Sequence, residues 1–136
     1  MKRTRYLIAA LLAAMAAVPA SADAYEWNIA QAGSYPGGLR CVSTTGSRVC
    51  FEGEGDKIWV KDTKRDHYSA LAKWRVPLER REGYCRNRLT AGYWGYCNKD
   101  FSEWASFHFW AARYDRDTNR FLGPWSKGGS DRVANP

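Results

Sequence analysis

Hydrophobic and polar residues alternate with a period of two along three segments of the chain, at positions 56–62, 68–76 and 104–114. In the first segment Ile58 and Val60 share one side, and Lys57, Trp59 and Lys61 share the other. Such alternation is typical of strands that bury one face, because successive side chains point to opposite sides of a sheet. Glycine and aspartate turn signals separate the runs. The pattern predicts an all-β fold, a small antiparallel β-sandwich or barrel.

The other two segments also have distinct faces. In the second, which Pro77 ends, the apolar face consists of Ala70, Ala72, Trp74 and Val76. In the third, the apolar face consists of Ala105, Phe107, Phe109 and Ala111, and the opposite face carries Trp104, Ser106, His108, Trp110 and Tyr114. The apolar faces are the candidate core, and the opposite faces are the candidate surface.

Residues 1–24 have the pattern of a secretory signal peptide. Lys2, Arg3 and Arg5 form a basic start, an apolar run follows at 6–18, and small residues stand at Ala22 and Ala24. The apolar run is too short to cross a bilayer. We therefore expect cleavage near residue 24 and a secreted protein, extracellular or associated with the cell wall, with no integral membrane segment in the mature chain.

The rest of the chain is expected to form one domain. Residues 25–38 are rich in glycine, alanine and serine and predict a loose N-terminal arm, followed by a secreted β domain at 39–126 and a flexible tail at 127–136. The formal net charge is +7, but acidic and basic residues are interspersed. This indicates an ordinary mixed surface, and nucleic acid is not expected as a partner.

Four cysteines, Cys41, Cys50, Cys85 and Cys97, follow the leader. In an oxidising compartment they can pair in three ways. Each of the local pairs, Cys41 with Cys50 and Cys85 with Cys97, encloses glycine-containing turn residues between extended arms. We therefore predict two local disulfides, each closing a hairpin. No Cys-x-x-Cys motif is present, so neither a zinc site nor any other metal or cofactor is expected.

Several short motifs resemble a group of small secreted four-cysteine proteins of actinobacteria, similar to those of Streptomyces. They are Val49-Cys50-Phe51, the run 55–63 around Trp59, Gly83-Tyr84-Cys85-Arg86-Asn87 and Gly92-Tyr93-Trp94-Gly95-Tyr96-Cys97-Asn98. The similarity covers about positions 40–114. That group has no assigned biochemical activity. The resemblance therefore implies secretion and disulfide bonding, but no reaction.

The best local match to a catalytic motif is Asp66-His67-Tyr68, which resembles a run in microbial ribonucleases of the barnase type. Glu54 could serve there as the base and Arg65 as a phosphate ligand. Such enzymes place the histidine near the chain end and pack a helix on the sheet, and neither feature is evident here. A ribonuclease is thus a remote alternative, and we expect no catalytic residues and no enzyme.

Exposed aromatic rings are a more specific signal, because such rings stack on sugars and anchor protein interfaces. The predicted binding residues are Lys57, Trp59 and Lys61 on one strand and His108, Trp110 and Tyr114 on another. If these strands are neighbours, their faces merge into one aromatic and basic surface. The competing interpretation is that these rings are buried or covered by lysine stems.

Together, the leader, the cysteines and the aromatic residues predict a secreted, non-catalytic binding module for a cell-envelope polymer, a carbohydrate or a protein. The alternative is an inhibitor of a secreted hydrolase. Small two-disulfide β-sandwich inhibitors of α-amylase present a Trp-Arg-Tyr triplet, which Trp74-Arg75-Val76 matches in part. Burial of Trp74 would count against that alternative.

Overall fold

The structure is a computed structural model that describes residues 24–134. The strands are β1 Glu26–Ile29, β2 Gln31–Ala32, β3 Arg40–Thr44, β4 Ser47–Glu52, β5 Lys57–Asp62, β6 Ser69–Val76, β7 Arg81–Asn87, β8 Trp94–Asn98, β9 Ser106–Asp115, β10 Arg120–Leu122 and β11 Gly129–Arg132. One turn of 3-10 helix, η1 Pro77–Glu79, joins β6 to β7. The expected signal peptide lies outside the described residues, apart from Ala24.

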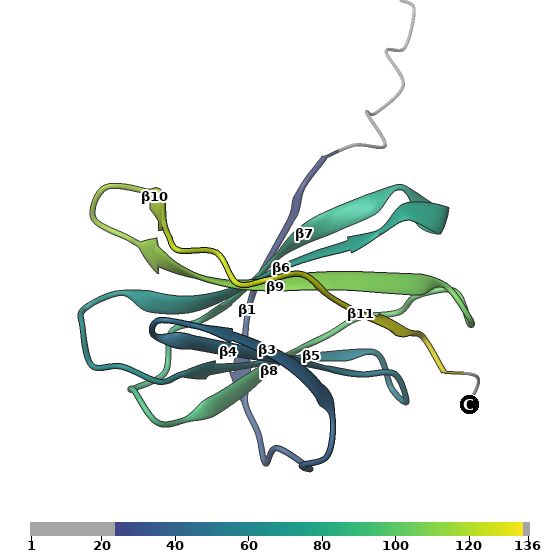
Figure 1. Ribbon diagram of the computed structural model, residues 1–136, viewed down its shortest axis with the longest axis horizontal. Helices are drawn as coiled ribbons and strands as arrows, with labels where there is room; N and C mark the ends of the chain where they lie inside the picture. Colours follow the sequence, from purple (N-terminus) through teal and green to yellow (C-terminus); the bar gives the residue numbers. More distant parts are fainter. Residues whose placement is uncertain (1–23, 135–136) are drawn as a thin grey trace, which may run out of the picture.

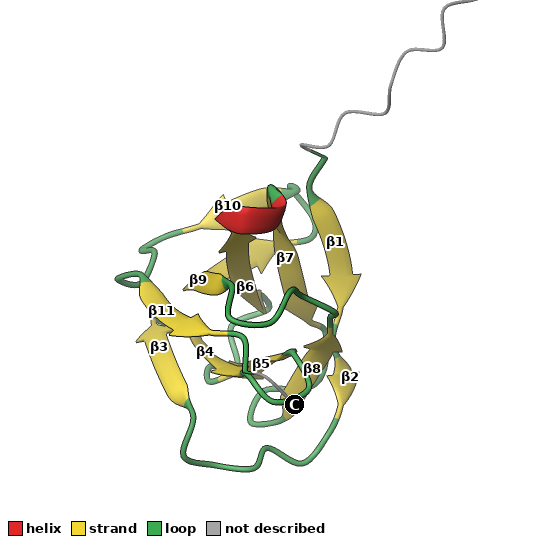
Figure 2. Ribbon diagram, turned by 90° about the vertical axis from the view of Figure 1, so that its right-hand side faces the viewer, coloured by secondary structure: helices red, strands yellow, loops and turns green. Residues whose placement is uncertain are grey.

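The strands form two sheets packed face to face (Figure 1). One has six strands in the order β1-β7-β6-β9-β10, with β11 also paired to β9, and the other has five in the order β2-β8-β5-β4-β3. At one edge of the sandwich the chain passes from β1 of the six-stranded sheet directly into β2 of the five-stranded sheet. At the opposite edge β11 lies beside β3 (Figure 2). The all-β sandwich is thus confirmed, with one parallel pair, β1 with β7, among the antiparallel ones.

The core between the sheets consists of the predicted apolar faces. Phe51 of β4 stacks on Phe107 of β9 with ring centroids 3.8 Å apart, which joins the two sheets. Trp74 of β6 is fully buried beside them. Burying each of these rings stabilises the fold by roughly 1.5–3 kcal/mol. Because Trp74 is buried, it cannot present a surface triplet, and the inhibitor alternative loses the residue that suggested it.

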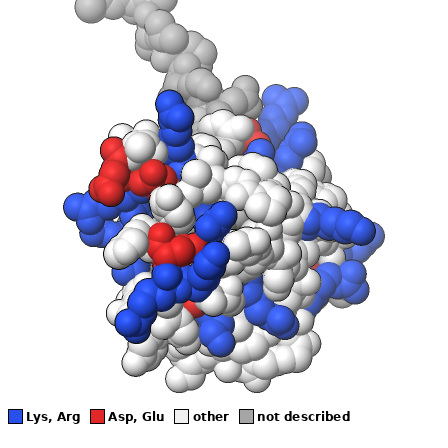
Figure 3. All heavy atoms as spheres, turned by 60° about the vertical axis from the view of Figure 1, so that its left-hand side comes forward, with Lys and Arg blue, Asp and Glu red and all other residues white. Residues whose placement is uncertain are grey.

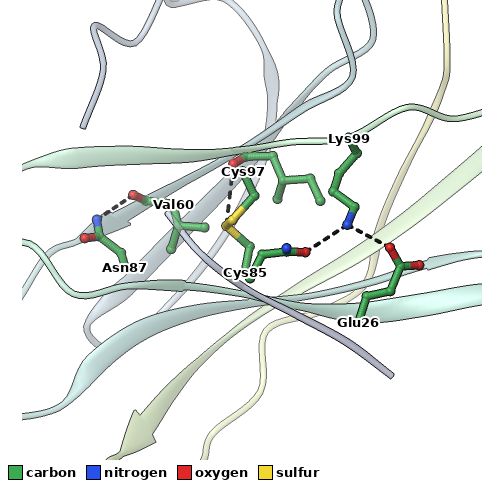
Figure 4. Close-up of a disulfide and its surroundings, with 8 residues drawn as sticks. Glu26, Val60, Cys85, Asn87, Cys97 and Lys99 are labelled. Carbon is green, nitrogen blue, oxygen red and sulfur yellow. Dashed lines mark hydrogen bonds and ion pairs between the residues drawn. A yellow bond between two sulfur atoms is a disulfide. The ribbon is translucent and has the colours of Figure 1, made fainter. Parts of the chain in front are cut away.

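Both predicted disulfides are present. Cys41–Cys50 joins directly paired residues of β3 and β4. Cys85–Cys97 joins β7 of one sheet to β8 of the other (Figure 4). The second bond therefore does not close a hairpin, as the sequence suggested, but fastens the two sheets together.

The expectation of a loose arm at 25–38 is wrong for residues 26–29 and 31–32, which form β1 and β2. The backbone N–H of Ala30, where the chain changes sheets, donates to the carbonyl of Arg86 at 2.8 Å. At Gly83 the backbone of Glu26 passes so close that an added Cβ would lie 2.2 Å from its carbonyl oxygen. Only glycine permits this approach.

Glu26 fixes β1 further through two ion pairs. Its carboxylate accepts from Arg81 Nε at 2.9 Å. It also accepts from Lys99 Nζ at 2.8 Å (Figure 4). The hydrogen bond from Arg81, assisted by Lys99 and opposed by partial burial, lowers the pKa of Glu26 to about 2. The carboxylate is therefore ionised across the ordinary pH range. The residues on either side, Tyr25 and Trp27, are held in place by this anchor.

The expectation of a flexible tail at 127–136 is wrong for residues 129–134. β11 pairs antiparallel with β9. Beyond it, the Val133 side chain is buried in the core, and its backbone exchanges hydrogen bonds with Trp104 and Ala105. Val133 therefore adds a buried apolar side chain to the core, which the mostly polar composition of this segment does not indicate.

Candidate binding surface

The six predicted binding residues belong to different sheets. Lys57, Trp59 and Lys61 lie on β5 of the five-stranded sheet, whereas His108 and Trp110 lie on β9 of the six-stranded sheet. In a sandwich the outer faces of the two sheets point away from each other. The prediction that these strand faces merge into one surface is therefore wrong.

Trp59 is not available to a ligand either, because its side chain is only 3% exposed. Its indole N–H donates to Glu52 Oε2 at 2.7 Å, and its ring packs edge-on against Tyr35. The chain passes over the ring at Gly33, where an added Cβ would lie 3.2 Å from it. The expectation of an exposed ring at this position is wrong, because alternation identifies the outer face but not the loop that covers it.

The two neighbouring lysines are engaged with other rings of the same face. Lys57 Nζ lies 5.2 Å from the Tyr96 ring centroid, and Lys61 Nζ lies 5.8 Å from that of Trp94. Both are half-buried cation–π contacts of the kind that cover aromatic surface. These contacts occupy both lysines, and a cavity of about 260 Å³ lined in part by Lys57, Trp59 and Tyr96 remains on this face.

The outer face of the six-stranded sheet is different. Rings from five separate parts of the chain contact one another there, and we call this set the aromatic patch. Its members are Tyr25, Trp27 of β1, Tyr84 of β7, Tyr114 of β9, Phe121 of β10 and Trp125. Four of them remain open to solvent: Tyr25 is 52% exposed, and Trp27, Phe121 and Trp125 are each 42% exposed.

Strand pairing explains why these rings gather. Trp27 is the register partner of Tyr84, and Phe121 is the partner of Tyr114. Leu71 of β6 and Ala112 of β9 lie between those two pairs and are register partners of each other. Both are fully buried yet lie outside the core cluster between the sheets. The alternation places them on the outer face, so larger side chains of that face cover them.

Of the predicted residues on β9, Tyr114 is a member of the patch and Trp110 adjoins it. Lys73 Nζ lies 5.7 Å from the Trp110 ring centroid and 6.0 Å from that of Trp125. His108 is further along the strand, paired with Arg75 and Ser130. The structure therefore places two of the six predicted residues at this surface.

Basic side chains lie next to the aromatic patch. The Arg86 guanidinium carbon lies 5.0 Å from the Tyr114 ring centroid, and Arg86 Nε donates to Ser69 Oγ at 2.9 Å. Partial burial, and then the nearby charges of Arg88 and Arg116, lower the pKa of Arg86. Figure 3 shows one side of the molecule, on which Lys and Arg side chains, with some Asp and Glu side chains among them, border a broad uncharged area.

A cavity of about 590 Å³ lies elsewhere, at the end of the sandwich where β5 begins. Its lining includes Glu54, Asp56 and Asp100. Burial raises the pKa of Asp56, whose carboxylate accepts the backbone N–H of Phe101 at 2.8 Å. Within residues 24–134, no group of side chains is arranged to hold a metal ion.

The ribonuclease residues do not come together. Glu54 lines the large cavity before β5, whereas Arg65 and His67 line a separate cavity of about 260 Å³ beyond its other end. A strand the length of β5 separates them by roughly 20 Å. A base and an acid so far apart cannot act on one phosphate.

None of the helical structure in residues 24–134 has the length and hydrophobicity needed to span a bilayer. Comparisons with protein-family models, curated proteins and solved structures find no significant match to this chain. The resemblance to secreted actinobacterial proteins stays a prediction, and the surface must be interpreted from its own chemistry.

Proposed function

We propose that the protein is a secreted, non-catalytic binding module, and that its ligand binds on the aromatic patch. The observation that carries this proposal is the set of four rings, 42–52% exposed, that touch one another or a shared neighbour on the outer face of one sheet. Contiguous exposed apolar surface is uncommon on monomeric proteins and marks interaction sites. Aromatic residues are also the commonest anchors of binding energy.

Two observations support the non-catalytic and extracellular parts of the proposal. The candidate acid and base, His67 and Glu54, line different cavities. Two disulfides, one of them between the sheets, are typical of proteins that mature in an oxidising compartment. The rigid sandwich would then serve to present the patch.

The test is retention of the mature protein on isolated cell wall, chitin, cellulose and starch, compared with that of single variants. Trp27→Ala and Trp125→Ala are expected to weaken retention at least tenfold, which is a normal effect for an aromatic anchor. The matched control is Trp104→Ala, because Trp104 is 61% exposed and lies outside the patch. That variant should be retained like the wild type.

Thermal unfolding of each variant separates binding from folding. Trp125 packs on Phe121 alone among the patch rings, so Trp125→Ala serves as the test even if Trp27→Ala is poorly folded. The proposal is contradicted if folded Trp125→Ala is retained like the wild type, or if the wild type is retained on none of the four materials.

A further inference from the structure

Three arginines next to the aromatic patch lack acidic partners. Within the part of the chain that the structure describes, the ion pairs involve Arg81, Lys99 and Arg113 as cations, and none includes Arg86, Arg88 or Arg116. Arg88 and Arg116 are exposed, and Arg86 is half-buried. None of the three charges is therefore neutralised by an ion pair, although Asp115 and Asp117 flank Arg116 in the chain.

Arg86 is the best placed of the three to hold an anion. Its Nε atom is occupied by Ser69, while its two terminal nitrogens make no hydrogen bond to the described part of the protein. A planar guanidinium with two free donors matches the two oxygens of a carboxylate. Partial burial, and then the charges of Arg88 and Arg116, lower the pKa of Arg86, and a bound anion would offset the repulsion between these charges.

A chain of ring contacts joins Arg86 to a second cation. It runs from Arg86 to Tyr114 at 5.0 Å, on to Phe121 at 5.5 Å and Trp125 at 5.9 Å, and ends at Lys73, 6.0 Å from the Trp125 ring. Two positive groups, Arg86 and Lys73, therefore contact the rings of the aromatic surface. A ligand that fits it has apolar faces for the rings and repeated negative charges for the cations.

We propose that the aromatic patch binds an acidic polysaccharide, with sugar rings packed on Trp27, Phe121 and Trp125 and sugar carboxylates bound by Arg86. This inference rests on the proposed function and specifies its ligand class. The C–H faces of pyranose rings pack on aromatic side chains, and uronic acid residues supply a carboxylate at every repeat.

Neighbouring ring centroids in the patch are 4.9–6.5 Å apart, so the rings pack against one another. They form one continuous shallow surface, across which a sugar chain can lie. A single-stranded nucleic acid is the competing ligand, because its bases also stack on exposed rings.

The experiment compares binding of polygalacturonate with binding of its methyl ester, which has the same backbone without the charge. By calorimetry, the wild type should bind polygalacturonate at least tenfold more tightly than the ester, and added salt should weaken the binding. Arg86→Gln should lose at least tenfold in affinity for polygalacturonate, and Arg88→Gln and Arg116→Gln severalfold each. The matched control is Arg48→Gln, an exposed arginine on the other sheet, which should have no effect.

Equal affinity for polygalacturonate and its ester, absence of binding to polygalacturonate, tighter binding to an oligodeoxynucleotide, or unchanged affinity in Arg88→Gln and Arg116→Gln would each overturn the inference. The two exposed arginines keep it falsifiable if Arg86→Gln disturbs β7. Failure here is distinct from failure of the proposed function, because Trp125→Ala would still lose retention on a neutral polymer if the patch binds a different ligand.

Discussion

Replacing Trp59 with alanine is expected to lower the free energy of unfolding by about 3–5 kcal/mol, the usual cost of deleting a buried large aromatic ring. The ring is 3% exposed, and its indole N–H is bonded to Glu52. The change removes the packing of this ring against Tyr35 and Tyr96 and leaves the Glu52 carboxylate without its donor. Retention on the ligand should be unchanged in the folded fraction, since Trp59 lies on the sheet opposite the patch.

Denaturant unfolding of wild type and variant measures this difference directly. Trp104→Ala is the control, because Trp104 is largely exposed, and it should change stability by no more than about 0.5 kcal/mol. A Trp59→Ala protein that is as stable as the wild type but no longer retained would show that the face of β5 binds the ligand and that the patch does not.

Among substitutions that add a single methyl group, Gly83→Ala is expected to destabilise the protein most. The added Cβ would lie 2.2 Å from the carbonyl oxygen of Glu26 and 2.9 Å from its carbonyl carbon, both backbone atoms that no side-chain rotation can move. We expect β1 to leave the sheet, which breaks its pairing with β7 and removes Tyr25 and Trp27 from the patch. Stability should fall by about 3 kcal/mol or more, and retention at least tenfold.

Thermal unfolding together with limited proteolysis of residues 25–32 checks this expectation, since a displaced strand is cut readily. Gly123→Ala is the matched control, because its added Cβ would meet nothing closer than a backbone nitrogen at 3.8 Å. A Gly83→Ala protein with wild-type stability and an uncut N-terminal segment would contradict the anchoring role of β1.

The strands with long alternation were predictable from the sequence because the signal is local. The segments 56–62 and 68–76 contain β5 and β6, and the segment 104–114 contains all of β9 except its last residue, with the expected residues in the core. The disulfides were predictable as well, although Cys85–Cys97 joins two sheets. Spacing along the chain constrains which cysteines can meet but does not tell in which sheet each strand lies.

The burial of Trp59 could not be predicted from alternation. The pattern placed Trp59 correctly on the outer face of β5, but its burial depends on a segment near Gly33 that is distant in sequence. Which strand faces share a surface is likewise decided by sheet order, a property of the whole chain. For this reason the prediction that Trp59 and Trp110 share one surface was wrong.

The patch was missed because most of its rings lie outside the strongest strand patterns. One signal was available: Glu26, Trp27, Asn28 and Ile29 alternate between polar and apolar. The alternation is inverted relative to a normal strand, since Glu26 and Asn28 hydrogen-bond Lys99 while Trp27 and Ile29 are exposed. A strand whose polar residues are half-buried and bonded to the protein, and whose apolar residues are exposed, is a candidate for presenting a binding face.

The most direct test of the proposed surface is an NMR titration that follows the indole N–H signals of the seven tryptophans as soluble cell-wall polysaccharide is added. If the ligand binds on the aromatic patch, the signals of Trp27, Trp125 and the adjoining Trp110 will shift, and those of the buried Trp59 and Trp74 and of Trp94 and Trp104 will not. Shifts confined to Trp59 and Trp94, with Trp27 and Trp125 unchanged, would place the ligand on the other sheet and contradict the account.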